Sequence, residues 1–226
     1  MKKTLRLGFI ISSILLVFFI VFTFLITNIN VKAIGPLNSN VGFSFLNEVI
    51  FKLCGTNLIF DKLSDIMLII SFLVAICFII LGICQLIKRK SFKKVDSEIY
   101  LLGFTYLFVL IAYVVFEVLT INHRPVLVDG KLEASYPSTH ILITFTILST
   151  AVFAIKKYIH KKPLKIITTF TLEIIIVLSI VFRLLSGMHW ATDILGALLL
   201  ATTLTSLYKS FELVIKNKRE QKRTDK

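Results

Sequence analysis

The stretch that decides the fold is residues 66–87, IMLIISFLVAICFIILGICQLI, which contains no charged residue. A helix that crosses a lipid bilayer needs roughly 20 mostly apolar residues, and this segment supplies them. Five further segments of the chain have a similar length and apolar character, and we expect an all-α polytopic membrane protein with six transmembrane helices. The predicted spans are 7–26, 66–87, 99–119, 139–155, 166–185 and 190–208.

The composition of the whole chain agrees with this class. Hydrophobic residues make up 56% of the 226 residues and charged residues only 17%, whereas an average soluble domain has about 25% charged residues. The mean hydropathy is +0.87. These values exclude a cytosolic enzyme, a disordered protein and a secreted disulfide scaffold. The three cysteines have no paired spacing, which argues against structural disulfides and a zinc site, and we expect neither a metal nor a cofactor.

The basic residues alternate between the connections that join the predicted spans. Twenty of the 26 Lys and Arg residues lie in the N-terminus, 88–98, 156–165 and the segment from Lys209 onward. The positive-inside rule places these segments, and therefore both termini, in the cytoplasm of a multi-pass protein of the cell membrane. Segments 120–138 and 186–189 then open on the external face. This distribution explains the net charge of +13 without a nucleic-acid partner.

Composition also divides the chain into three parts. Residues 1–62 form an N-terminal transmembrane anchor and an external loop, which is expected to contain a short interfacial helix near 43–53. Residues 63–208 are expected to form a helical core. Residues 209–226 form a basic cytoplasmic tail.

Polar and ionisable residues gather at the span ends that this orientation places outside. Such groups are costly in or beside a bilayer and usually mark a site. One cluster is Asn-His-Arg-Pro at 122–125, and a second is Tyr-Pro-Ser-Thr-His at 136–140. The third consists of Arg183, His189 and Asp193.

Several of these side chains suit the binding of a phosphate group. Arg124 and Arg183 carry planar guanidinium groups, which are the preferred clamp for phosphate because they offer two parallel donors. Ser138, together with backbone amides at the start of a helix, makes an anion-binding terminus. The sequence therefore predicts an anion site between the third and sixth spans.

The remaining side chains suit phosphoryl transfer. His189 and Asp193 are four residues apart, so they share one face of a helix, and the carboxylate can hold one ring nitrogen while the other stays basic. His140 comes from a different helix and can protonate a leaving oxygen. This set indicates transfer through a covalent phosphohistidine, a reaction that requires no metal.

The same clusters resemble the signature of the type 2 phosphatidic acid phosphatase superfamily of membrane lipid-phosphate phosphatases. Its first motif is Lys, six residues, Arg-Pro, and its second is Pro-Ser-Gly-His. Its third motif is Ser-Arg, five residues, His, three residues, Asp. The corresponding segments are 117–125, 137–140 and 182–193, in the same order and with the same spacing. The resemblance covers roughly residues 60–208 and implies six spans with an external site.

The resemblance implies a role for each matching residue. His189 is expected to be the nucleophile, Asp193 its orienter and His140 the general acid. The motif residues expected to bind substrate are Arg124, Arg183, Ser138 and Thr139, of which Thr139 stands where the family has Gly.

Glu117 departs from the pattern, because it stands where the family has Lys and changes the local charge by two units. We expect Glu117 to turn toward Arg124 or another cation. Lys131, a further substrate-binding candidate, or His123 is expected to replace part of the missing positive charge.

The predicted function is hydrolysis of a lipid phosphomonoester or diphosphate at the outer face of the cell membrane. Candidate substrates are phosphatidic acid, phosphatidylglycerophosphate and undecaprenyl diphosphate, and the expected partners are this lipid phosphate and membrane lipids. Three alternatives stay open: a lipid-to-lipid phosphotransferase, a catalytically weak protein that binds lipid phosphate, and a small-ion transporter. The sequence does not indicate the oligomeric state.

Overall fold

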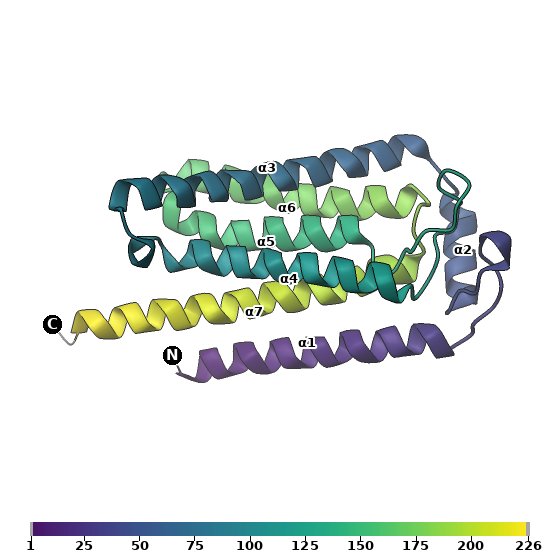
Figure 1. The fold of residues 1–226 in the computed structure, drawn as a ribbon, viewed down its shortest axis with the longest axis horizontal. Coiled ribbons are helices and arrows are strands. Elements are labelled where there is room, and N and C mark those ends of the chain that lie inside the picture. Colours follow the sequence, from purple (N-terminus) through teal and green to yellow (C-terminus); the bar gives the residue numbers. More distant parts are fainter. Residues whose placement is uncertain (1, 225–226) are drawn as a thin grey trace.

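The computed structural model describes residues 2–224, and this part of the chain is helical almost throughout (Figure 1). Within these residues there are isolated β-bridges but no extended strand. The α-helices are α1 (Lys2–Asn28), α2 (Ser44–Cys54), α3 (Leu58–Arg89), α4 (Ser97–Leu119), α5 (Thr139–Tyr158), α6 (Lys162–Leu185) and α7 (Ala191–Thr224). Two 3-10 helices, η1 (Pro36–Asn38) and η2 (Phe92–Lys94), lie in connections.

All six predicted spans are confirmed as helices that are long and apolar enough to cross a membrane. The short helix predicted near 43–53 is α2. Two helices are longer than predicted, because α3 begins at Leu58 and α7 continues to Thr224, so the predicted divisions at 62/63 and 208/209 fall inside continuous helices. The polar residues after position 208 include many Lys, Arg, Glu and Gln, which are good helix formers. They end the apolar span without ending the helix.

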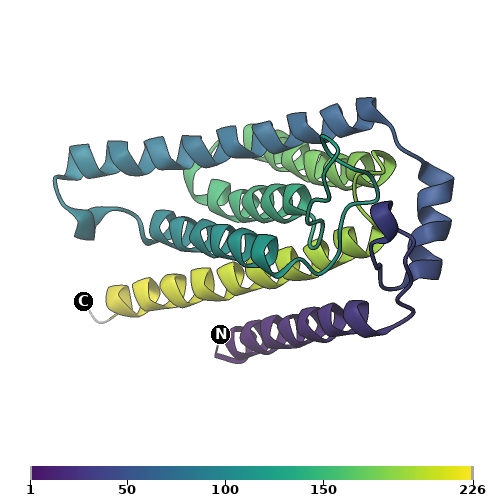
Figure 2. The same cartoon turned by 45° about the vertical axis from the view of Figure 1, so that its right-hand side comes forward.

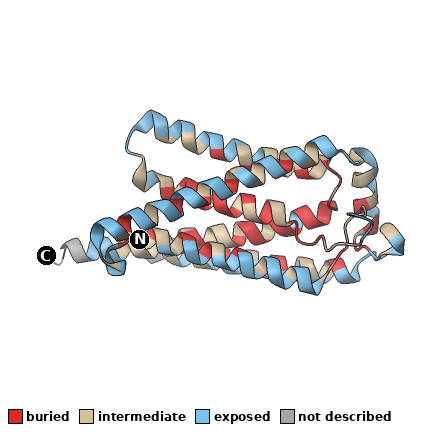
Figure 3. Ribbon diagram, turned by 45° about the horizontal axis from the view of Figure 1, so that its top comes forward, coloured by how far each residue is buried: buried red, intermediate tan, exposed pale blue. Residues whose placement is uncertain are grey.

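The six long helices run along one common direction, and α2 crosses them at one end (Figure 1). Figure 2 shows the same arrangement from a second direction, with both ends of the chain far from α2. In α5 and α7, 56% and 44% of the most apolar window is buried, against 17–22% in the other four helices. Figure 3 shows this buried centre and the exposed outer faces. The helices α5 and α7 therefore form the core, and the other long helices present apolar side chains to their surroundings.

Side-chain caps fix the start of two helices that border the site. The side-chain oxygen of Asn57 accepts hydrogen bonds from the backbone N–H groups of Ile59 and Phe60 at the start of α3. At the start of α7, Oδ2 of Asp193 accepts a hydrogen bond from the backbone N–H of Trp190 at 2.9 Å. This contact is one half of a capping box. Each cap satisfies backbone donors that the helix itself leaves unpaired.

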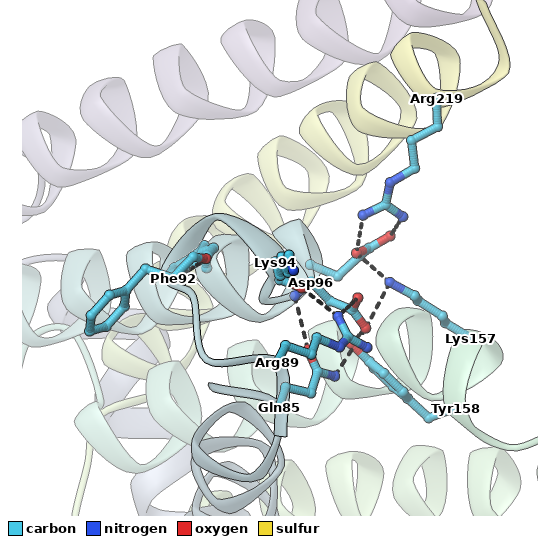
Figure 4. A network of polar contacts seen from close by, with 10 residues as sticks. Gln85, Arg89, Phe92, Lys94, Asp96, Lys157, Tyr158 and Arg219 are labelled. Atoms are coloured by element: carbon cyan, nitrogen blue, oxygen red, sulfur yellow. Dashed lines mark hydrogen bonds and ion pairs between the residues drawn. The ribbon is translucent and has the colours of Figure 1, made fainter. Parts of the chain in front are cut away.

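A network of ionic contacts joins the helices at the end of the bundle away from α2 (Figure 4). Asp96, between α3 and α4, accepts hydrogen bonds from Arg89 (2.9 Å), Gln85 (3.0 Å) and Tyr158 (3.1 Å). Burial alone would raise the pKa of Asp96, but hydrogen bonds from Arg89 and Lys157 outweigh it and lower the pKa to about 2. Asp96 therefore stays ionised at neutral pH and holds three helix ends together.

Glu98 at the start of α4 makes the most buried contacts of this network. It accepts hydrogen bonds from Lys157 at 2.8 Å and Arg219 at 2.9 Å, and its side chain is 9% exposed. We expect Glu98→Gln to reduce the free energy of unfolding by roughly 1–3 kcal/mol, because hydrogen bonds between charged groups are lost. Melting temperature in detergent measures this loss. Glu212→Gln, which breaks the more exposed pair with Lys209, is the matched control with little expected change, and equal losses in both variants would contradict the prediction.

Candidate active site

The segment between α4 and α5 folds over the end of the bundle where α2 lies. Residues 122–135 pair as an irregular antiparallel hairpin, in which the backbone N–H of Arg124 donates to the carbonyl of Glu133 at 3.0 Å. The indole N–H of Trp190 donates to the carbonyl of His123 at 2.7 Å. The hairpin is thereby tied to the start of α7, and the first and third sequence clusters come together.

His189 and Asp193 lie at the start of α7, and both are buried. Nδ1 of His189 is 3.6 Å from Oδ2 of Asp193, which is a close contact but longer than a hydrogen bond. Asp193 accepts its hydrogen bonds from Asn122 Nδ2 at 3.1 Å and from the backbone N–H of Trp190. Burial, followed by the positive charges of Arg183 and Arg124, holds the pKa of His189 well below its usual value. The imidazole is therefore neutral at neutral pH, the form that a nucleophile requires.

The second cluster forms the start of α5. Ser138 precedes the helix, its backbone N–H donates to the carbonyl of Asp193 at 3.1 Å, and its hydroxyl is buried without a partner. At the second residue of the helix, Nε2 of His140 lies 2.8 Å from Oδ1 of Asp65 in α3. A helix start with a buried, unpaired hydroxyl suits an anion, because the free backbone N–H groups and the helix dipole both favour negative charge.

Each of the two arginines has a carboxylate partner. Arg183 in α6 is 1% exposed, and its Nη1 donates to Oδ1 of Asp61 at 2.6 Å. Nε of Arg124 lies 3.2 Å from Oε2 of Glu133, an ion pair whose atoms are not aligned as a hydrogen bond. Both guanidinium groups therefore keep donors that these carboxylates do not use.

Buried side-chain nitrogens without a hydrogen-bond partner are concentrated at this site. Among the side chains that the structure describes, every buried nitrogen without a hydrogen-bond partner in the protein belongs to Arg124, His140, Arg183 or His189. Buried polar atoms are nearly always paired, so a group of unpaired ones requires an explanation. An anion with several acceptor oxygens would accept hydrogen bonds from the N–H groups among them, and phosphate is such an anion.

A cavity of about 270 Å³ reaches His189 from the side of α4. Its lining includes Arg124 and Thr139, and also two carboxylates, Glu117 of α4 and Glu133 of the hairpin. The aromatic rings of α4 and Tyr136 complete the wall. The cavity lining thus combines a cation and the candidate nucleophile with two carboxylates, one of which, Glu133, pairs with Arg124.

Most of the predicted site residues come together, whereas Lys131 lies apart from them and Arg124 has another partner than Glu117. The structure groups His189, Asp193, His140, Arg124, Arg183, Ser138 and Thr139 at one end of the bundle. Lys131 is exposed at the tip of the hairpin and does not line the cavity. Within the described residues Arg124 pairs with Glu133 and not with Glu117, because Arg124 and Glu133 are neighbours across the hairpin.

Three contacting carboxylates were missed by sequence reasoning. Asp61 and Asp65 lie four residues apart at the start of α3, and Glu133 lies on the returning arm of the hairpin. An acidic pair with helical spacing just before the most apolar span is a signal that was available for the first two. For Glu133 the only clue was its place in the loop that carries Arg124.

Comparison with known proteins finds one matching protein family. The family model that matches is described as the PAP2 superfamily, and it matches residues 116–214, the segment from the end of α4 into α7. The segment that carries these motif residues is therefore similar to the PAP2 superfamily. The matched segment contains all the motif residues from Arg124 to Asp193. It ends beyond the last predicted span and does not include α3.

A solved structure shares the fold of this chain. It is described as the first transmembrane PAP2-type phosphatidylglycerolphosphate phosphatase from Bacillus subtilis. The similarity has a TM-score of 0.61 at 20% sequence identity, and covers 90% of this chain and 96% of that one. No curated protein matches the chain significantly.

Proposed function

We propose that this protein is a membrane phosphatase of the PAP2 superfamily that hydrolyses a lipid phosphate through a phosphohistidine at His189. The observation that carries the proposal is the set of unpaired buried nitrogens on Arg124, His140, Arg183 and His189. Arg124 and His189 line the same cavity, and the charges of Arg124 and Arg183 act on both His140 and His189. The match to the PAP2 superfamily and the fold of the Bacillus subtilis protein support the same class of reaction.

In the first step, Nε2 of His189 attacks the phosphorus atom, since Nδ1 lies on the side of Asp193. A phosphorus–nitrogen bond forms as the bond from phosphorus to the lipid oxygen breaks. His140 gives a proton to that oxygen, so the lipid leaves as an alcohol, or as a lipid monophosphate when the substrate is a diphosphate. Arg124, Arg183 and Ser138 hold the phosphoryl oxygens during the transfer.

In the second step, water attacks the phosphorus atom of the phosphohistidine. The phosphorus–nitrogen bond breaks, His140 takes a proton from the water, and inorganic phosphate leaves. Both histidines return to their starting states. The cycle consumes one water for each phosphate released and needs no metal.

The proposal includes an orientation in the membrane. The segments rich in Lys and Arg lie at the helix ends opposite the site, and the positive-inside rule assigns that end to the cytoplasm. Both termini are then cytoplasmic and the site faces outward at the cell membrane. The lipid headgroup enters sideways between helices while its apolar tail stays in the bilayer.

The direct test is phosphate release by the purified protein in detergent, with EDTA present. Phosphatidic acid, phosphatidylglycerophosphate and undecaprenyl diphosphate are the three substrates to compare. We expect release from at least one lipid, unchanged by chelation and saturable with lipid concentration. Folded protein that releases no phosphate from any of them would contradict the proposal, and activity that EDTA removes would contradict the mechanism.

Product analysis distinguishes the proposal from a lipid-to-lipid phosphotransferase. The hydrolase releases inorganic phosphate, whereas the transferase produces a newly phosphorylated lipid when an acceptor alcohol is present. A catalytically weak lipid-phosphate-binding protein is the other alternative. The observation in its favour is that two carboxylates, Glu117 and Glu133, line the cavity next to Arg124.

Replacing Glu117 with lysine tests how strongly that negative charge limits catalysis. The change moves the charge beside the bound phosphate by two units, and each charge at about 4–6 Å is worth roughly 1 kcal/mol or more near a protein surface. We expect kcat/KM for the preferred lipid phosphate to rise by about 10-fold or more. Glu117→Gln serves as the control, with about half of this effect on a logarithmic scale. A fall in kcat/KM in both variants would instead assign Glu117 a contact with the substrate.

A further inference from the structure

The first two turns of α3 carry two carboxylates that reach the site from outside the segment matched by the family model. Asp61 and Asp65 are four residues apart, so they lie on one face of the helix. Asp61 accepts the hydrogen bond of Arg183 at 2.6 Å, and Asp65 lies 2.8 Å from Nε2 of His140. Arg183, which is proposed to bind phosphate, and His140, the proposed proton donor, therefore both contact carboxylates of α3.

The start of α3 is fixed against the turn that leads to His189. The backbone N–H of Asn57 donates to the carbonyl of Ser186 at 3.0 Å. Gly187 has a φ of 65°, and a Cβ at this position would lie 2.0 Å from the carbonyl oxygen of Gly55. The two backbones thus touch where only glycine fits. The two carboxylates are consequently held in a constant position relative to the nucleophile.

The contact between Asp65 and Nε2 of His140 leaves Nδ1 of His140 available for proton transfer. Because Nε2 faces the carboxylate, Nδ1 is the nitrogen left to exchange a proton, and it is buried without a partner in the protein. A carboxylate at one ring nitrogen fixes the orientation of an imidazole and stabilises positive charge on the ring. Asp65 is itself 51% exposed, so it lies at the rim and not in the protein interior.

The contact between Asp61 and Arg183 is of a different kind. A guanidinium group has five N–H donors, and Asp61 accepts a hydrogen bond from Nη1 only, while Nε of Arg183 is buried and unpaired. Asp61 therefore fixes the plane of the guanidinium group and leaves other donors for an anion. It also balances a positive charge that would otherwise be buried alone, which is costly.

We propose that Asp61 and Asp65 are positioning residues of this active site, Asp65 for the proton transfer by His140 and Asp61 for phosphate binding by Arg183. This inference rests on the proposed phosphatase function. The competing interpretation is that both carboxylates stand where phosphate oxygens bind and must leave when substrate enters. The fixed backbone of α3 favours positioning. Because the start of α3 is anchored to the turn before His189, Asp61 and Asp65 cannot easily move away when substrate enters.

The role of Asp65 is tested by comparing two leaving groups. For Asp65→Asn we expect kcat/KM on the preferred lipid phosphate to fall by about 100-fold, the lower range for loss of general acid catalysis. On p-nitrophenyl phosphate, whose phenolate leaves without a proton, we expect kcat/KM to fall by less than about 5-fold, because kcat/KM reports departure of the leaving group and not the second step, which both substrates share. Asp65→Glu should recover part of the loss on the lipid. A purely structural role would reduce both activities by the same factor, and that result, or no loss on either substrate, would overturn the assignment.

The role of Asp61 is tested by inhibition with inorganic phosphate. We expect Asp61→Asn to weaken this inhibition and to raise KM by about 10-fold or more, with a smaller effect on kcat, because Arg183 loses its fixed orientation. Tighter phosphate binding in Asp61→Asn would instead show that Asp61 competes with the ligand, and would overturn the positioning role.

Wild-type protein and His189→Ala are measured alongside, so that failure of the phosphatase function can be distinguished from failure of the positioning roles of Asp61 and Asp65. Wild-type protein that releases no phosphate from any lipid contradicts the phosphatase function itself. Active wild-type protein with unselective Asp65→Asn behaviour contradicts only the positioning role. Melting temperatures show whether each variant is folded, and Asp65→Ser replaces Asp65→Asn in the same comparison if the latter does not fold.

Discussion

His189→Ala is expected to reduce phosphate release from the preferred lipid by at least about 10⁴-fold, since removal of a nucleophile leaves only the contribution of binding. The reason lies in the surroundings of His189. Its ring is buried and neutral, and Nε2 has no partner within the protein. The arginines that would hold the phosphate lie close enough to lower its pKa. No other described side chain combines these features.

The measurement has two parts. Phosphate release is followed with lipid substrate, and the protein is also labelled with ³²P-substrate, quenched, and examined for a bond that is stable to alkali and labile to acid. Wild-type protein should carry this label and His189→Ala should not. His160→Ala is the matched control, because His160 is an exposed histidine at the opposite end of the bundle. Label or turnover that persists in His189→Ala would exclude His189 as the nucleophile.

Sequence reasoning predicted the spans well because their signal is local. Each is a run of about 20 apolar residues, and the bilayer imposes that length whatever the neighbouring helices do. The ends were less accurate for a physical reason. Asp61 and Asp65 lie before the apolar run of α3, and the charged residues after position 208 follow the apolar run of α7. Helical hydrogen bonding continues through such residues although the apolar character ends.

The site was predicted to the extent that its residues lie in compact motifs. His189 and Asp193 are four residues apart, with His189 two residues before α7 and Asp193 in its first turn, and Ser138 and His140 are almost adjacent, so each pair is close in the chain. The partner carboxylates depend on tertiary contacts, and no local pattern fixes these. Asp65 meets His140 across 75 residues and Asp61 meets Arg183 across 122. For the same reason the sequence could not show that Arg124, one of the partners expected for Glu117, pairs with Glu133.

Asp193→Asn is the second large effect, with an expected loss of about 10³–10⁴-fold in kcat by analogy with carboxylates that orient a catalytic histidine. The amide keeps the volume of Asp193 but places a donor where only acceptors fit. Both oxygens of Asp193 are already engaged, by Asn122 Nδ2 and by the backbone N–H of Trp190. One of these contacts must become a donor–donor conflict, and the negative charge beside His189 disappears.

Nδ1 of His189 and Oδ2 of Asp193 are 3.6 Å apart, which is too long for a hydrogen bond. The Asp193→Asn variant therefore tests whether Asp193 orients His189 during the reaction. Catalytic hydrogen bonds are often long without substrate and shorten in the complex. If the contact between His189 and Asp193 shortens in this way, Asp193→Asn loses activity as stated. Asn122→Ala, which keeps the carboxylate, then loses less than about 100-fold in kcat. If Asp193 is only the cap of α7, the result is different. The melting temperature of Asp193→Asn then falls while kcat at a temperature where it is folded stays near the wild-type value. Measuring both quantities on both variants separates a carboxylate that orients the nucleophile from one that only begins a helix.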